Sequence, residues 1–288
     1  MSLFIYGLIQ SVTLMLYGYG FSLVYGISGI ANFAHGGFYV LGGYITWCII
    51  NHLGFSQITS GVLAVLTMGF LGFAFYWGIL LRIRGIILSE LVITFVAGIA
   101  ILEFLNWKGL YGFYYNLQPF IEDDITIGEV SVDYQRLIVL ASGVVLAGLM
   151  WLFVHHTKIG LSFRGIAQEE RTALSLGIES DWVGSLSMAM GSALAAVAAI
   201  LILPLGVLEA NVGYEVLIYA VTVAIVGGLE STPGMVLASF IIGFGQILVA
   251  EFIGSSWMII VPLATIVVIL ALRPSGLFGK FKELEERV

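Results

Sequence analysis

The chain has 288 residues, of which 60% are hydrophobic and 10% are charged, and its formal net charge is −7. Soluble domains carry about 25% charged residues, so this composition excludes a water-soluble fold of this size. The acidic balance argues against a nucleic-acid partner, because contacts to phosphates need a basic surface. Lipid offers the backbone no hydrogen-bond partners, so the long apolar runs are predicted to be transmembrane helices.

Nine apolar segments are predicted to cross the lipid bilayer as an all-α, polytopic transmembrane helical bundle with discontinuous helices. They are residues 3–27, 36–53, 58–81, 86–106, 135–155, 182–204, 214–230, 234–252 and 256–272. If a short segment is re-entrant, the number of spans falls to eight. The first segment lacks the basic start and the cleavage site of a signal peptide, so we expect it to remain as a span. Residues 1–288 are predicted to form a single transmembrane domain.

Two glycine-rich segments interrupt the helical pattern. Residues 26–37 read GISGIANFAHGG, and residues 227–234 read GGLESTPG. Non-helical backbone at membrane depth is tolerated only inside protein or beside a water-filled cavity. A break that recurs in both halves of a chain therefore indicates a transport pathway. The alternative interpretation is that both segments are ordinary turns between helices.

Polar side chains inside a membrane span are costly and often functional. Asn32 and His35 are therefore candidates for a hydrogen bond to a solute, with the alternative that they hold the broken backbone. Phe33 is a candidate for the lining of an apolar pocket. The full set of candidate pathway residues is Asn32, Phe33, His35, Gly36, Gly37, Gly227, Gly228, Glu230 and Pro233. The glutamates near span ends are expected to reach the membrane interface: Glu90, Glu103, Glu215 and Glu251.

Basic residues predict the orientation of the chain. They gather in the short turn with Arg82 and Arg84, in the segment 156–181 and in the tail from Arg273. Because basic loops favour the cytoplasmic side, these three regions are predicted to be cytoplasmic, including the C-terminus. The acidic segment 107–134 and the N-terminus are then predicted to lie outside.

The segment 156–181 has the pattern of an amphipathic helix from Gly165 to Gly177, with Ile166, Leu174 and Ile178 on one apolar edge. Such a helix suits the docking of a partner protein. The alternative is a helix that lies on the bilayer surface, for which the balance of basic and acidic residues gives only a weak attraction.

Motifs for chemistry are absent from the sequence. It has no Gly-x-x-x-x-Gly-Lys-Ser/Thr phosphate loop, no His-Glu-x-x-His zinc motif and no Gly-x-Ser-x-Gly elbow. The adjacent His155 and His156 point to different faces of a helix and make a poor pair of metal ligands. We therefore expect no enzymatic activity, no cofactor and no metal. A membrane enzyme would need a nucleophile, an acid and a base that converge, and no such set is evident.

The chain resembles the permease subunits of bacterial and archaeal branched-chain amino acid ABC importers, most of all the first of the two paired permeases. The strongest match is residues 24–36, where the family motif is close to Val-Tyr-Gly-x-x-Gly-x-x-Asn-Phe-Ala-His-Gly. Three more matches follow in the family's order, at residues 164–178, 226–234 and 273–279. The chain departs from the family at Gly37, where a glutamate is often found.

This resemblance implies an importer permease of the cell (inner) membrane that translocates branched-chain, hydrophobic amino acids. It implies four kinds of partner besides the lipid bilayer: a second permease subunit, similar or identical, two ATP-binding ATPase subunits and an extracytoplasmic solute-binding protein. The segment 156–181 would be the cytoplasmic coupling loop, and 107–134 an extracytoplasmic loop. The coupling residues carried over from the family are Arg164, Gln168, Glu169, Glu170, Arg171, Leu176 and Gly177.

Two other functions stay open. Related permeases import urea or short amides, so the motifs do not fix the solute. A self-sufficient channel or secondary carrier for a small polar solute is the competing class, and it would be revealed by uptake through the chain alone without ATP.

Overall fold

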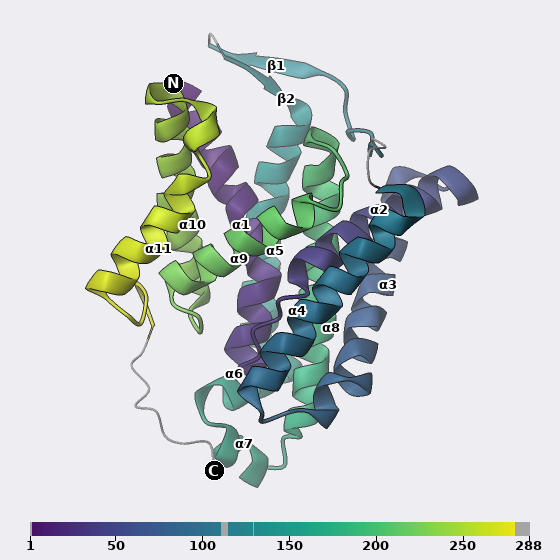
Figure 1. Cartoon of the computed structure of the whole chain (residues 1–288), viewed down its shortest axis with the longest axis vertical. Coiled ribbons are helices and arrows are strands. Elements are labelled where there is room, and N and C mark those ends of the chain that lie inside the picture. Colours follow the sequence, from purple (N-terminus) through teal and green to yellow (C-terminus); the bar gives the residue numbers. More distant parts are fainter. Residues whose placement is uncertain (1, 111–114, 129, 280–288) are drawn as a thin grey trace.

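Helices form most of the chain in the computed structural model, which describes residues 2–110, 115–128 and 130–279 (Figure 1). The α-helices are α1 (Ser2–Ser28), α2 (His35–Leu53), α3 (Gln57–Gly78), α4 (Ile87–Leu105), α5 (Tyr134–His156), α6 (Lys158–Gln168), α7 (Glu170–Ser175), α8 (Ser180–Ile202), α9 (Val212–Gly227), α10 (Thr232–Phe252) and α11 (Ile260–Leu272). Four short helical turns are η1 (Leu80–Arg82), η2 (Asn106–Leu110), η3 (Leu203–Leu205) and η4 (Ser255–Trp257). Each segment predicted to cross the membrane coincides with a helix, so the predicted helical bundle is confirmed.

Within the described residues, seven helical segments are long and apolar enough to cross a membrane. They contain α1, α3, α4, α5, α8, α10 and α11. The remaining candidates are α2 and α9. With 16 residues, α9 is about 24 Å long, shorter than the roughly 30 Å of hydrocarbon in a bilayer. Polar residues and glycines make α2 less apolar than its 19 residues would suggest. The number of spans therefore lies between these seven and the nine predicted.

The centre of the bundle is formed by α1 and α8. In their most apolar stretches 78% and 72% of the residues are buried, against 6% in α11. The central helices can approach closely because glycines meet where they cross. A Cβ atom on Gly20 would lie 2.5 Å from the carbonyl oxygen of Gly191. Small residues at such a crossing allow the backbones to touch, and larger ones would separate them.

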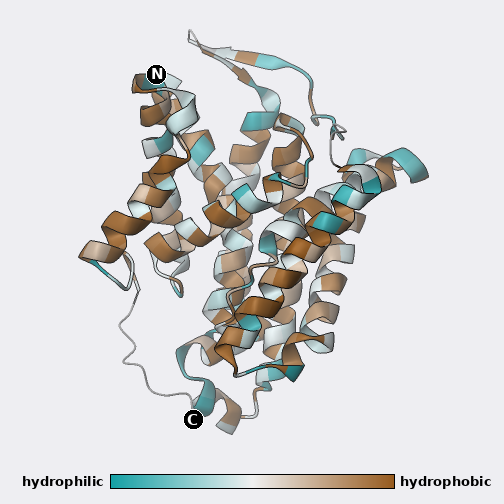
Figure 2. Cartoon of the chain, viewed as in Figure 1, coloured by the Kyte–Doolittle hydropathy of each residue, from teal (hydrophilic) through white to brown (hydrophobic). Residues whose placement is uncertain are grey.

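The outer helices are rich in apolar residues, as the brown colour of α4 and α11 shows in Figure 2. In the most apolar stretches of α4 and α5, only 22% and 17% of the residues are buried. Large exposed side chains on these helices include Phe95, Val144 and Leu263. An apolar surface of this extent needs lipid or a partner protein against it.

The two polar segments of the chain lie at opposite ends of the bundle (Figure 1). At one end, β1 (Asp124–Ile127) and β2 (Val130–Asp133) form an antiparallel hairpin in which Asp124 pairs with Asp133. At the other end lie α6 and α7. This arrangement agrees with the prediction that 107–134 and 156–181 face different sides of the membrane. Which end faces the cytoplasm stays a prediction.

Candidate functional site

The first break separates α1 from α2, and its polar side chains hold the backbone. Gly29 ends α1 with a φ of 69°, a conformation that glycine adopts without strain. The fully buried Asn32 accepts a hydrogen bond from the amide of Ala34 at 3.1 Å, and its own amide group contacts the sulfur of Met188 at 3.3 Å. The buried Nε2 of His35 lies 2.9 Å from the carbonyl oxygen of Tyr17. A carbonyl oxygen only accepts, so Nε2 is the donor.

These contacts bear on the two interpretations of the break. Asn32 and His35 both point into the chain, and their polar contacts with the amide of Ala34 and the carbonyl of Tyr17 offset part of the cost of burying them in a low-dielectric interior. The geometry therefore supports the backbone-holding role that the sequence left as an alternative.

The two glycines after His35 allow helices to meet backbone to backbone. A Cβ atom on Gly36 would lie 1.9 Å from the carbonyl oxygen of Gly213, at the start of α9. A Cβ atom on Gly37 would lie 3.1 Å from the carbonyl oxygen of Gly98, in α4. The start of α2 therefore packs closely between α9 and α4, and any side chain at position 37 would have to push against the backbone of α4.

Phe33 is the one pathway candidate of this break with a partly exposed side chain. It contacts Phe95 edge to face, with ring centroids 6.4 Å apart. The two rings border a shallow, largely apolar cleft between α4 and α9, whose lining is Phe33, Gly37, Phe95, Gly98, Ile99, Leu102, Gly213, Tyr214 and Leu217. Sequence reasoning missed the α4 and α9 residues of this lining, because nothing local in the sequence reveals that these helices flank Phe33.

The second break, between α9 and α10, is covered by the carboxyl-terminal motif. The amide of Leu277 donates to the carbonyl of Val226 at 2.9 Å, and that of Phe278 donates to the carbonyl of Gly227 at 3.0 Å. Two of the segments that resemble the family, 226–234 and 273–279, thus fold onto each other. These bonds satisfy carbonyls that the end of a helix leaves without partners.

The remaining residues of the second break begin α10 and lie against the first break. Ser231 caps α10 by accepting a hydrogen bond from the amide of Gly234 at 3.1 Å, and Pro233 lies in the first turn. Glu230 is exposed, and its Cα would lie 3.8 Å from a Cβ atom on Gly26. The structure therefore brings the ends of α1 and α9 together, but it places Gly227 and Gly228 in packing against backbone.

The segment 156–181 forms two helices, which corrects the prediction of one helix from Gly165 to Gly177. The chain bends at Glu169, whose backbone is extended with φ −157° and ψ 96°. Because of this bend, Ile166 is buried while Leu174 is 50% exposed, so the predicted common apolar edge is wrong. The φ of 83° at Gly177 then turns the chain toward α8.

Most of the coupling candidates lie on the surface of this segment. Gln168, Glu169, Arg171, Leu176 and Gly177 are exposed, whereas Arg164 and Glu170 are half-buried. Leu176 is 78% exposed at the tip of the bundle. Leu174, two residues before it, is 50% exposed, so the tip carries two exposed leucines.

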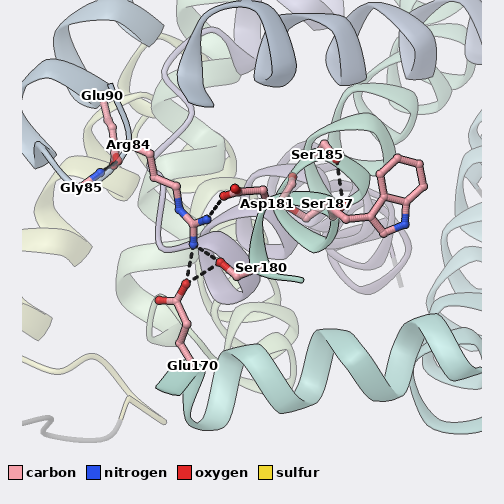
Figure 3. A network of polar contacts seen from close by, with 10 residues as sticks. Arg84, Gly85, Glu90, Glu170, Ser180, Asp181, Ser185 and Ser187 are labelled. Atoms are coloured by element: carbon pink, nitrogen blue, oxygen red, sulfur yellow. Dashed lines mark hydrogen bonds and ion pairs between the residues drawn. The ribbon is translucent and has the colours of Figure 1, made fainter. Parts of the chain in front are cut away.

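A cluster of charges ties α7 and α8 to the turn before α4 (Figure 3). Arg84 forms ion pairs with Glu170 and Asp181 and also donates to the hydroxyl of Ser180. The hydroxyl of Ser180 donates to Glu170 at 2.6 Å. Burial alone would lower the pKa of Arg84, but Tyr76 and the two carboxylates outweigh it and raise that pKa above its ordinary value. The guanidinium therefore stays charged at any pH the protein meets.

Glu90, near the start of α4, is held inside the chain by the turn that precedes the helix. Its side chain is buried, with 4% exposure, and accepts a hydrogen bond from the amide of Gly85 at 2.8 Å. Its position in the first turn of α4 explains this, because a helix N-terminus favours a negative charge and the preceding turn has an amide to satisfy. The turn thus folds back over the helix, and the position of Glu90 relative to the membrane interface stays a prediction.

Comparisons with known proteins agree on one family. Residues 3–270 match the family described as branched-chain amino acid transport system / permease component. The high-affinity branched-chain amino acid transport system permease proteins LivH of Escherichia coli and BraD of Pseudomonas aeruginosa are each 28% identical, over 95% of this chain and 94% of theirs. A probable branched-chain amino acid transport permease protein LivH of Methanocaldococcus jannaschii is 22% identical, over 94% of this chain and 90% of its own.

One solved structure has a similar fold. It is that of PsaBC from Streptococcus pneumoniae in complex with Fab, which matches with a TM-score of 0.53 and 12% sequence identity. The match covers 96% of this chain and 93% of the other. At this identity the likeness concerns the fold alone.

Proposed function

The chain belongs to the family of branched-chain amino acid transport permease components, and from that membership we propose how it moves its solute. As the permease component of a branched-chain amino acid ABC transport system, it is a multi-pass membrane protein without catalytic activity of its own. What remains to be assigned is the wall of the solute path, the docking surface for the ATPases and the orientation.

The solute path runs along the cleft at Phe33. The supporting observation is the position of the Phe33 side chain. The neighbouring candidates Asn32, His35, Gly36 and Gly37 are buried, whereas Phe33 is partly exposed and borders a largely apolar cleft. Full burial of a leucine or valine side chain is worth roughly 1.5–3 kcal/mol, and the cleft supplies one apolar wall of such a site. Urea and short amides have no comparable apolar group, so this lining favours branched-chain amino acids as the solute.

A second permease subunit, similar or identical, supplies the opposite wall. The cleft at Phe33 is shallow and lies on a face where α4 presents exposed apolar side chains such as Val92, Phe95 and Val96. Two such faces opposed to each other would enclose a passage and remove these side chains from lipid. Weak contacts suffice there, because an extracytoplasmic solute-binding protein provides the affinity.

The α6–α7 segment is the cytoplasmic docking site of the two ATPases. Its exposed residues, above all Leu176, offer an apolar contact with a polar rim, which is the usual composition of a protein interface. With this end in the cytoplasm, the β1–β2 hairpin faces outward, where the solute-binding protein delivers its cargo.

Uptake by the reconstituted transporter tests the path. Phe33→Ala is compared with Phe70→Ala, which removes a ring that is 69% exposed on α3, away from the cleft at Phe33. We expect Phe33→Ala to lower leucine uptake by about tenfold, the equivalent of 1.4 kcal/mol, and Phe70→Ala to leave it unchanged. Equal uptake by both variants contradicts the path at Phe33, and uptake by the permease alone without ATP contradicts the importer mechanism.

A further inference from the structure

We propose that Arg84 and α4 form a mechanical relay that carries the movement of the α6–α7 segment to the first helix break. Arg84 is then a positioning residue for transport, although it contacts neither the solute nor an ATPase. The proposal rests on the proposed function in one respect, since it takes α6–α7 to be the segment on which the ATPases act.

The relay begins where Arg84 joins three elements (Figure 3). Glu170 is the first residue of α7, and Ser180 and Asp181 begin α8, and all three contact the guanidinium of Arg84. Charge-assisted contacts of this kind, made by a planar donor with a fixed geometry, fix orientation as well as distance. A displacement of α7 is therefore imposed on the turn that carries Arg84.

The next link joins this turn to α4. The residue after Arg84 is Gly85, whose φ of 91° favours glycine and whose amide donates to the buried carboxylate of Glu90 at 2.8 Å. The amide of Glu90 in turn donates to the carbonyl of Ile86 at 3.0 Å. The turn is thus fastened to the first turn of the helix, and it cannot move without α4.

The last link joins α4 to the first break. The hydroxyl of Thr94 has three carbonyl oxygens within reach: those of Glu90 at 2.9 Å and Leu91 at 3.0 Å in its own helix, and that of Ala31 in the break at 3.2 Å. Four residues further on, a Cβ atom on Gly98 would lie 3.0 Å from the carbonyl oxygen of Phe33. From the start of α4 to Gly98 is about 17 Å of continuous helix. A helix of this length moves as a rod, so it transfers displacement to the backbone that carries Phe33.

The experiment uses the complete transporter, with its ATPases and solute-binding protein, in proteoliposomes. Leucine uptake and ATP hydrolysis are measured together for Arg84→Ala, and Arg82→Ala is the matched control because Arg82 is exposed in the same turn. We expect Arg84→Ala to lower the leucine transported per ATP by roughly tenfold, within the range that substitutions in coupled networks produce. ATPase co-purification should be unchanged, and Arg82→Ala should behave as the native chain.

Further variants separate a relay from a merely structural role. Arg84→Lys should restore part of the coupling. Thr94→Val removes the hydroxyl contact of the last link and leaves the packing at Gly98 in place. It does not touch the docking segment, and it should lower the leucine transported per ATP, by less than Arg84→Ala does. If both act on one path, the double variant Arg84→Ala with Thr94→Val loses no more coupling than the stronger single variant.

The possible outcomes distinguish failure of the relay from failure of the proposed docking site. Native transport per ATP in Arg84→Ala with normal ATPase binding overturns the relay and leaves the proposed function standing. If Arg84→Ala prevents assembly of the transporter, Thr94→Val decides, and native coupling in that variant overturns the relay. If the native chain binds no ATPase through Leu176 and its neighbours, it is the proposed docking site that fails.

Discussion

The close crossing of α2 and α9 at Gly36 predicts a large loss of stability when that glycine is replaced by alanine. Replacing Gly36 by alanine adds one methyl group, and its carbon would lie 1.9 Å from the carbonyl oxygen of Gly213. Ordinary contact begins at 3.4 Å, so the two backbones must separate by about 1.5 Å, the difference between these two distances. The obstacle is backbone and not the end of a flexible side chain, so local rotation cannot relieve it.

Overpacking a well-packed interior costs typically 1–3 kcal/mol, and the rigid obstacle here places Gly36→Ala at about 3 kcal/mol or more. Gly213→Ala should be milder, at roughly 1–2 kcal/mol, because its nearest neighbour is the Cδ2 atom of Leu102, which can move. Gly148→Ala is the control, because α5 leaves that position open, with no atom within 4 Å. It should stabilise the helix by up to about 1 kcal/mol.

Thermal unfolding of the three purified variants in detergent ranks them by stability. We expect Gly36→Ala to unfold at the lowest temperature, Gly213→Ala at an intermediate one and Gly148→Ala no earlier than the native chain. Uptake by the reconstituted transporter should fall in Gly36→Ala as well, because the displaced helices border the cleft at Phe33. If Gly36→Ala unfolds at the same temperature as Gly148→Ala, the backbone contact between α2 and α9 is not present in the protein.

Four further predictions concern other parts of the chain. Ser231→Ala removes the cap of α10 and should destabilise the protein by about 1 kcal/mol in thermal unfolding, whereas Ser231→Asp, which can still accept the bond, should not. Ending the chain at Ser275 removes the two amides that cover the end of α9 and should destabilise it by roughly 1 kcal/mol for each hydrogen bond lost, with a chain ending at Gly279 as the control. Glu90→Gln keeps an acceptor for Gly85 and should be tolerated, while Glu90→Leu should cost about 1–3 kcal/mol, and native stability of the leucine variant would contradict the assigned bond. Leu176→Asp should weaken ATPase co-purification, and Ile121→Asp, exposed near the hairpin at the other end, should leave it intact.

The sequence predicted the helices well because lipid leaves the backbone few options. A long apolar run in a bilayer must satisfy its backbone internally, so apolar length alone located all nine segments. The two breaks were equally visible, since glycines cluster at residues 26–37 and 227–234. What periodicity could not predict was the bend at Glu169, after which Glu170 meets Arg84 from a distant part of the chain.

Contacts between distant parts of the chain were beyond sequence reasoning. Nothing local to residues 273–279 indicates that their amides cover the end of α9, and nothing local to Glu90 indicates that the preceding turn folds over it. From the sequence, Arg84 contributed only to the predicted orientation of the chain in the membrane, as one of several basic residues. Its role in joining α7 and α8 to α4 follows from the fold and not from its neighbours in sequence.

The geometry of the first break has a consequence for how solutes are distinguished. Asn32 and His35 bond to the chain itself, and Gly36 and Gly37 are fixed by close backbone contacts, so each meets a structural requirement that does not depend on the solute. The motif can therefore recur in permeases for different solutes. Discrimination has to come from the side chains opposite Phe33, which α4 and α9 provide and which lie outside the motif. Exchanging Leu102 or Leu217 for polar residues should change which solute is carried, whereas exchanges of Asn32, His35 or Gly36 should only impair folding.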